Sequence, residues 1–302
     1  MKGILTPVLW GLTMAALILD SRTAMAGAAE GAMLCMQSMI PGLFPLMVLS
    51  SLLASSLPRG ALVAAGLLGG YPMGARNAAQ AYREGTLDRD SAERMAVASC
   101  CAGPSFLFGV ARDLRPALLW MIYLISAALL WLLLSPSPGI CAPGKPLTVT
   151  DVLPGSVAAM GQICGWVILM RAMLAVLDRW VLWMLPDWGR IAVWGSLEMT
   201  NGVLALGDLD PRPGFVLGAG MVGFGGICVM MQARAVARGL SLRLYFPGKV
   251  FQGCVCLLLA ALLTRTPLPA PVWIPVAAVG TGCALILRKN KKRCGNPTAV
   301  GV

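Results

Sequence analysis

Glu198 and the polar residues after it are the side chains of this sequence best suited to chemistry. They lie in GSLEMTNG, from Gly195 to Gly202, within an otherwise apolar segment. An acid in such a segment is costly to bury and by default marks a path for an ion, a proton or a solute. The alternative is an interfacial acid that caps a half-helix. We favour the first interpretation because Thr200 and Asn201 add donors and acceptors beside the carboxylate.

A second interrupted apolar segment, GLLGGYPMGARN, runs from Gly66 to Asn77. Its glycines lower helix propensity, and Pro72 removes a backbone donor, so the carbonyl groups that it frees need other partners. Within a bilayer such a break is tolerated only where protein or a water-filled cavity receives the exposed backbone groups. Interrupted segments at corresponding places in two halves of a chain are the best sequence indication of a transporter's central site.

Arg76 and Asn77 directly follow this second break. A guanidinium group binds a carboxylate through two parallel hydrogen bonds, so this position suits a dianionic solute. An arginine that snorkels to the membrane surface is the competing explanation. Tyr71 can stack on an aromatic ring, although a tyrosine at a helix break more often serves packing and hydrogen bonding.

The remaining candidates are glycines and amides in apolar segments. The glycines allow either close helix packing or the exposure of backbone amides to a solute. Buried glutamines need hydrogen-bond partners, so we expect them to face the protein interior, as interhelical contacts or as site lining. The predicted solute-binding residues are Gly70, Tyr71, Arg76, Asn77, Gly103, Glu198, Thr200, Asn201, Gly225, Gln232 and Gln252.

Two further polar residues have explanations at the membrane interface. Lys249 follows a basic loop, and we expect it to anchor that loop on the cytoplasmic side, with a role at the solute site as the alternative. Tyr123 lies with Trp120 and Trp131 in the apolar segment from Ala117 to Leu134, where aromatic residues toward the ends predict an interfacial belt.

Composition indicates a polytopic integral membrane protein. The 302 residues are 58% hydrophobic and only 12% charged, and the mean hydropathy of +0.77 lies well outside the range of soluble domains. We therefore expect the lipid bilayer as a partner and no nucleic acid.

Several classes of chemistry are disfavoured by residue type. The sequence has no histidine, and its ten cysteines are scattered without a C-x-x-C motif, so we expect no metal site and no cofactor. Without a Ser–His pair or a G-x-S-x-G motif, we expect no catalytic residues and no enzyme activity.

The predicted fold class is an all-α polytopic membrane protein with about ten membrane segments. We expect two inverted-repeat halves, residues 1–135 and 152–287, whose broken segments are interrupted helices or re-entrant hairpins. A linker rich in proline and glycine covers 136–151, and a basic tail covers 288–302. The first apolar run is expected to be a retained span. Cleavage after Ala26, as in a signal peptide, is the alternative.

Loop charges predict an orientation. The basic tail places the C-terminus in the cytoplasm, together with the N-terminus and the basic loop from Arg234 to Lys249. Counting each apolar segment as one crossing then places the polar loop from Gln80 to Arg94 on the outer side. This assignment fails if the broken segments re-enter the membrane without crossing it.

Several motifs in the same order resemble a known family. These are Gly70 to Ala75 with Gly103-Pro104, Leu197 to Gly202, Phe224 to Gly226 with Gln232, and Gly248-Lys249 with Gln252-Gly253. In them the chain resembles the YlbJ-like sporulation integral membrane proteins, which carry the nucleoside-recognition or Gate domain, from about residue 28 to residue 265. Cys100-Cys101 departs from that pattern, in which asparagine-like residues are expected, and this leaves the solute open.

Members of that family look like relatives of concentrative nucleoside transporters. The resemblance therefore implies an inner site built from two helical hairpins and broken helices, and for the sporulation branch it implies dipicolinate passage across a forespore membrane. We expect a secondary transporter of a small polar, anionic or heteroaromatic solute in a bacterial inner or forespore membrane. Its coupling ion would be a cation or a proton, and the oligomeric state is left open. The alternative is a membrane scaffold for spore formation that transports nothing.

Overall fold

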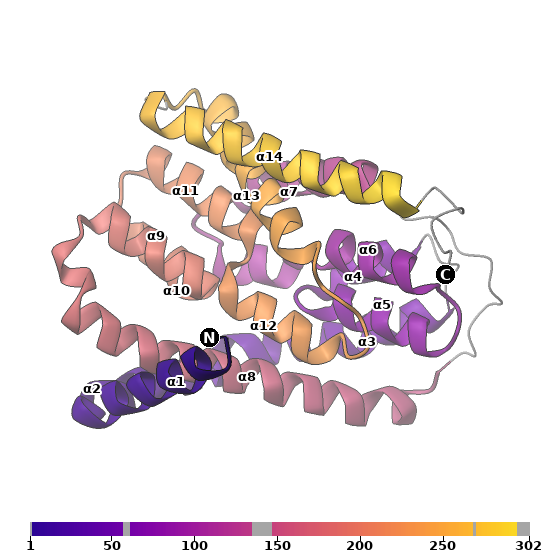
Figure 1. The fold of residues 1–302 in the computed structure, drawn as a ribbon, viewed down its shortest axis with the longest axis horizontal. Helices are drawn as coiled ribbons and strands as arrows, with labels where there is room; N and C mark the ends of the chain where they lie inside the picture. The colour runs from indigo at the N-terminus through magenta and orange to yellow at the C-terminus, as the bar shows by residue number, and fades with distance from the viewer. Residues whose placement is uncertain (1, 57–60, 135–146, 268–269, 295–302) are drawn as a thin grey trace.

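The computed structural model describes residues 2–56, 61–134, 147–267 and 270–294, and every regular element within these ranges is a helix (Figure 1). Six helical stretches are long and apolar enough to cross a membrane, which confirms the all-α membrane class but not the expected count of about ten segments. They are Ser21–Ser55, Pro116–Leu134, Val149–Trp180, Pro211–Val236, Tyr245–Thr264 and Pro271–Lys289.

Apart from one additional helix at each end of the chain, the elements follow the same order in both parts. A long helix is followed by two short helices, an interrupted helix and another long helix. The first part contains α1 (Lys2–Leu19), α2 (Ser21–Leu34), η1 (Cys35–Met39), α3 (Ile40–Ser56), α4 (Ala61–Gly69), α5 (Met73–Arg83), α6 (Arg89–Ser99), η2 (Phe106–Val110) and α7 (Pro116–Leu134). The second contains α8 (Val149–Trp180), η3 (Leu182–Met184), α9 (Asp187–Leu197), α10 (Met199–Leu204), η4 (Ala205–Asp208), α11 (Pro211–Phe224), α12 (Gly226–Val236), α13 (Tyr245–Thr264) and α14 (Ala270–Cys294).

The predicted boundaries of the linker and of the tail shift slightly. Helix α8 begins at Val149, inside the predicted linker 136–151, and most of that linker lies outside the described residues. Helix α14 runs to Cys294, so the first part of the predicted basic tail continues the helix.

Helices α2 and α3 form one continuous rod. A π-helical turn, η1, joins them at Cys35–Met39. Pro41 has no N–H to donate to the preceding turn, and a wider π turn at that place accommodates the missing hydrogen bond. The rod packs along α8, which crosses the lower part of the molecule in Figure 1.

Both sequence motifs with helix breaks are tips of helical hairpins. A Cβ atom on Gly66 would lie 3.0 Å from the Cα atom of Gly74, and one on Gly202 would lie 2.3 Å from the Cα atom of Gly195. Residues seven or eight apart in a straight helix are separated by about 10–12 Å. The pairs α4–α5 and α9–α10 therefore turn back on themselves. Counting each motif as a crossing was wrong for this reason.

Each hairpin is followed by an interrupted helix. The chain leaves helical geometry between α6 and η2 at residues 100–103, and α11 gives way to α12 at Gly225. Gly225 and Gly226 have φ angles of +82° and +81°, which a residue without a Cβ atom adopts without strain. In Figure 1, α9 and α10 lie toward the left of the molecule, and α4 and α5 lie toward the right.

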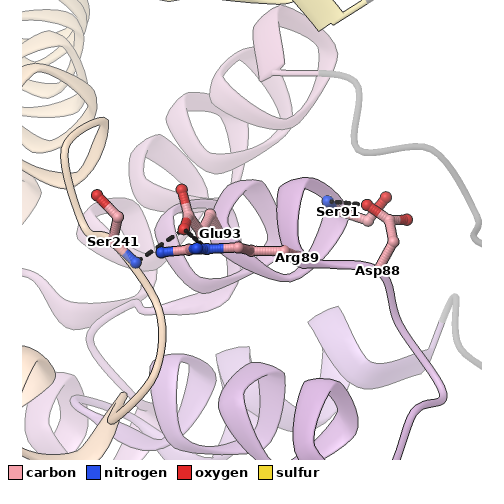
Figure 2. A network of polar contacts seen from close by, with 5 residues as sticks. All are labelled: Asp88, Arg89, Ser91, Glu93 and Ser241. Atoms are coloured by element: carbon pink, nitrogen blue, oxygen red, sulfur yellow. Dashed lines mark hydrogen bonds and ion pairs between the residues drawn. The ribbon is translucent and has the colours of Figure 1, made fainter. Parts of the chain in front are cut away.

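The loop before α13 lies beside the start of α6 (Figure 2). The Ser241 amide donates a hydrogen bond of 2.8 Å to Oε1 of Glu93, which also accepts one of 3.1 Å from Nε of Arg89. The loop from Gln80 to Arg94 and the loop from Arg234 to Lys249 thus share one end of the molecule. The prediction that they lie on opposite sides is wrong, because the hairpin α4–α5 removes one crossing between them.

This arrangement predicts which positions a membrane-impermeant reagent reaches from the same side of the membrane. Glu84 and Arg243 are exposed at the shared end, whereas Gly207 is exposed before α11, at the other end of the α11–α12 span. In sealed vesicles of one orientation, a membrane-impermeant maleimide should label Glu84→Cys and Arg243→Cys from the same side and Gly207→Cys from the opposite side. The wild-type protein, with its native cysteines, gives the background. Labelling of Glu84→Cys and Arg243→Cys from opposite sides would refute the arrangement.

Candidate solute site

The tip of the first hairpin packs backbone to backbone against the break after α6. Gly70 has a φ angle of +75°, and a Cβ atom on Gly103 would lie 2.9 Å from the Cα atom of Gly70. Leu68 contributes a carbonyl oxygen 3.3 Å from the same point. Glycine at both positions therefore allows the two interrupted backbones to meet.

The second hairpin repeats this contact with the break between α11 and α12. A Cβ atom on Gly226 would lie 3.2 Å from both the Gly195 carbonyl oxygen and the Met199 amide nitrogen. Gly225, beside it, approaches the other hairpin, because a Cβ atom there would lie 3.0 Å from the hydroxyl oxygen of Tyr71. The two tips and the two breaks thus meet at one centre.

Glu198 is the tip residue of the second hairpin and is only 2% exposed. Its carboxylate accepts hydrogen bonds of 3.1 Å from the Thr200 amide and 2.8 Å from the Asn201 amide, the first free donors of α10. Glu198 therefore caps a half-helix, as the alternative interpretation held, but in the protein interior. The ion pairs found within the described ranges give it no arginine or lysine partner.

A cavity of about 30 Å³ lies between the two hairpin tips and is lined from both parts of the chain. A volume of this size holds about one or two water molecules. The centre is therefore closed in this conformation. Its predicted lining residues are Tyr71, Gly103, Glu198, Thr200 and Gln232, and its other lining residues are Met39, Leu43, Phe106, Met199 and Val229.

A buried tyrosine pair ties the first tip to neighbouring helices. The Tyr71 hydroxyl donates to the Val222 carbonyl at 3.2 Å and lies 2.8 Å from the Tyr123 hydroxyl. Tyr123 also accepts a 2.8 Å hydrogen bond from the Ala102 amide in the α6 break. The expectation that Tyr123 belongs to an interfacial belt is wrong, since it is fully buried.

Removing the Tyr123 hydroxyl should destabilise the protein. Tyr123→Phe leaves the buried Ala102 amide without its acceptor, and such a loss costs about 1–3 kcal/mol. Thermal unfolding in detergent should show a lower Tm than wild type. Tyr82→Phe, a change at a half-buried tyrosine on α5, is the matched control. Equal Tm values for Tyr123→Phe and wild type would contradict the role of this hydroxyl.

Lys249 also belongs to this centre, although it was not among the predicted solute-binding residues. It is 1% exposed on α13, so the expectation of a cytoplasmic anchor is wrong. Its ammonium donates to the Cys100 carbonyl in the α6 break and, at 2.8 Å, to Oε1 of Gln252. The amide nitrogen of Gln252 in turn donates to the Ser126 hydroxyl at 3.3 Å. A lysine three residues before a glutamine, on one face of an apolar helix, was the available signal.

The other predicted site residues lie away from the cavity lining. Nη1 of Arg76 donates to the Ser156 hydroxyl of α8 at 3.1 Å. Asn77 and Asn201 are 4% and 3% exposed, and both atoms of each side-chain amide lack a hydrogen-bond partner within the described part of the chain. Buried amides without partners are rare in folded proteins, and each calls for an explanation such as a ligand or water.

The geometry of the centre suits the binding of polar groups. The centre offers a carboxylate, an ammonium, amides and tyrosine hydroxyls at the ends of half-helices, all of which hold polar groups by hydrogen bonding. Comparison with known proteins adds no identity to this geometry: no family model, no curated protein and no solved structure matches the chain.

Proposed function

We propose that this protein is a membrane transporter for a small polar solute and that the centre between the hairpin tips is its solute site. One observation carries the proposal. Two hairpin tips and two helix breaks, one of each from either part of the chain, meet around a buried cavity that contains Glu198. Secondary transporters bind solutes at such meeting points of discontinuous helices.

We further propose that the two parts are inverted repeats. The order of elements is the same in each, and the loop between α5 and α6 lies beside the loop after α12. A hairpin that enters from one side and a second that enters from the other would let the closed centre open alternately to each side. The tips, which pack through glycine contacts, are the parts that would move.

The proposed solute is small and polar, and is either anionic or heteroaromatic. Tyr71 and Phe106 supply ring surfaces at the cavity, while Thr200 and Gln232 supply hydrogen-bonding groups. The N-terminus of α10 favours negative charge, which the Glu198 carboxylate provides in the closed state. Dipicolinate, moved across a forespore or inner membrane, and a nucleoside are the two solutes to try first. Glu198 is the proposed residue for coupling to a cation or a proton.

Binding of the correct solute should raise the Tm of the purified protein. A ligand at 100 times its dissociation constant stabilises the native state by about 2.7 kcal/mol, which is a shift of roughly 5–10 °C for a chain of this size. Dipicolinate, a nucleoside and a non-aromatic dicarboxylate form the test set. A shift that differs between wild type and Glu198→Gln supports the site. An equal shift in both proteins would place binding elsewhere.

A scaffold that keeps this fold without transport is the second candidate. The observation that favours it is the small cavity, which is too small for either proposed solute in this conformation. Simultaneous replacement of Glu198 and Asn201 by alanine distinguishes the two functions in cells. If the doubly substituted protein reaches the membrane and spore formation is normal, the scaffold function is favoured. If spore formation is lost, transport is favoured.

A further inference from the structure

The buried ammonium of Lys249 stands where the first hairpin meets the α6 break. It donates to the carbonyl of Cys100, the residue directly after α6, and to Oε1 of Gln252 at 2.8 Å. The ring centroid of Tyr71, at the hairpin tip, lies 5.4 Å from its nitrogen, and that of Tyr245 lies 5.7 Å away. Two oxygens and two aromatic faces thus surround one positive charge.

These groups are the ligands that a monovalent cation takes in a transporter with broken helices. Unwound carbonyls and the C-terminal ends of half-helices coordinate cations there, and a helix C-terminus carries partial negative charge. Aromatic faces within about 6 Å add a cation–π attraction. Among the ion pairs of the described residues, none joins Lys249 to a carboxylate. The charge of Lys249 is therefore held as a bound cation would be held.

Neighbouring hydrogen bonds orient the acceptors toward this charge. The Gln252 side chain donates through Nε2 to the Ser126 hydroxyl at 3.3 Å, which directs its oxygen to Lys249. The Tyr245 hydroxyl donates to Sγ of Cys100 at 3.1 Å and fixes the residue whose carbonyl accepts from Lys249. The two acceptors of the Lys249 ammonium are thus held in place by hydrogen bonds to other residues.

We propose that Lys249 is a tethered cation: its ammonium permanently fills a monovalent-cation site between the first hairpin tip and the α6 break. The wild-type protein then needs no sodium or potassium ion to hold these two elements together. We also infer that no free ion at this site drives solute movement, and this part rests on the proposed transport function. Occupancy of the site by Lys249 is a property of the folded chain alone.

Lys249→Ala should create a site that small free cations fill. We would measure its Tm at equal ionic strength in choline, sodium, potassium and methylammonium chloride. In choline the Tm should fall by roughly 4–8 °C, because the Cys100 carbonyl loses its buried donor. Methylammonium or sodium should restore at least half of the loss. Wild type and Lys289→Ala, a change at an exposed lysine of α14, should each have a Tm that does not depend on which of the four salts is present.

Lys249→Met keeps the volume of the side chain but removes its charge. It should have a low Tm in every salt, since the methionine blocks the site. The proposal is overturned if Lys249→Met is as stable as wild type, or if the Tm of Lys249→Ala does not depend on the cation. Failure of the transport function would instead appear as absent uptake by the wild type, with these Tm differences intact.

Discussion

Gly74→Ala is expected to yield little folded protein. A Cβ atom on Gly74 would lie 2.2 Å from the carbonyl oxygen of Ser99 and 2.5 Å from the amide nitrogen of Cys100. Both atoms belong to the backbone at the C-terminal end of α6, so no flexible side chain can move aside. Overpacking usually costs about 1–3 kcal/mol, and here we expect the upper end or more. The measurement is the fraction of monodisperse protein after purification, together with its Tm.

Gly161→Ala is the matched control for this substitution. Gly161 lies in the middle of α8, and an added Cβ atom would meet nothing within 4 Å. Alanine favours a helix over glycine by about 1 kcal/mol, so this variant should be at least as stable as wild type. Normal yield and Tm for Gly74→Ala would show that the first hairpin does not press against α6 as described.

Glu198→Gln should lower the kcat/KM of solute uptake by roughly 10- to 100-fold while the protein still folds. The carboxylate accepts from two amides at the start of α10, and a glutamine offers only one oxygen to them. The change also removes the negative charge proposed for cation or proton coupling. Radiolabelled uptake into proteoliposomes, normalised to reconstituted protein, measures the effect.

Glu30→Gln provides the acidic control for that comparison. Glu30 is exposed and pairs with Arg171 at 2.7 Å, away from the cavity lining. Its neutralisation removes one negative charge from the protein outside the cavity lining, so uptake should stay close to the wild-type rate. If both variants transport equally, Glu198 has no special part in the cycle.

Residue types alone predicted the helix breaks but not their shape. Glycine and Pro72 in GLLGGYPMGARN exclude an ordinary span, and the structure interrupts the helix there. A kinked crossing helix and a hairpin require the same kinds of residues, however. The difference depends on the approach of Gly66 to Gly74, a contact that local propensity does not encode. The expected loop orientation failed for the same reason.

The sequence also did not indicate how deeply each polar side chain is buried. Tyr123 and Lys249 are amphipathic residues, and such residues suit a membrane interface as well as a buried polar centre. Only packing decides between the two positions, and both residues are buried. Glu198 was easier to predict because few positions within an apolar segment accept an acid at a low cost in free energy.

Uptake of labelled dipicolinate and of a labelled nucleoside into proteoliposomes tests the central claim most directly. Wild type, Glu198→Gln and protein-free liposomes would be compared under imposed proton and sodium gradients. We predict saturable uptake of one solute by wild type, reduced at least tenfold in Glu198→Gln. If folded wild-type protein moves neither these solutes nor other small anionic and heteroaromatic solutes above the protein-free level, the claim that this centre transports such solutes is contradicted.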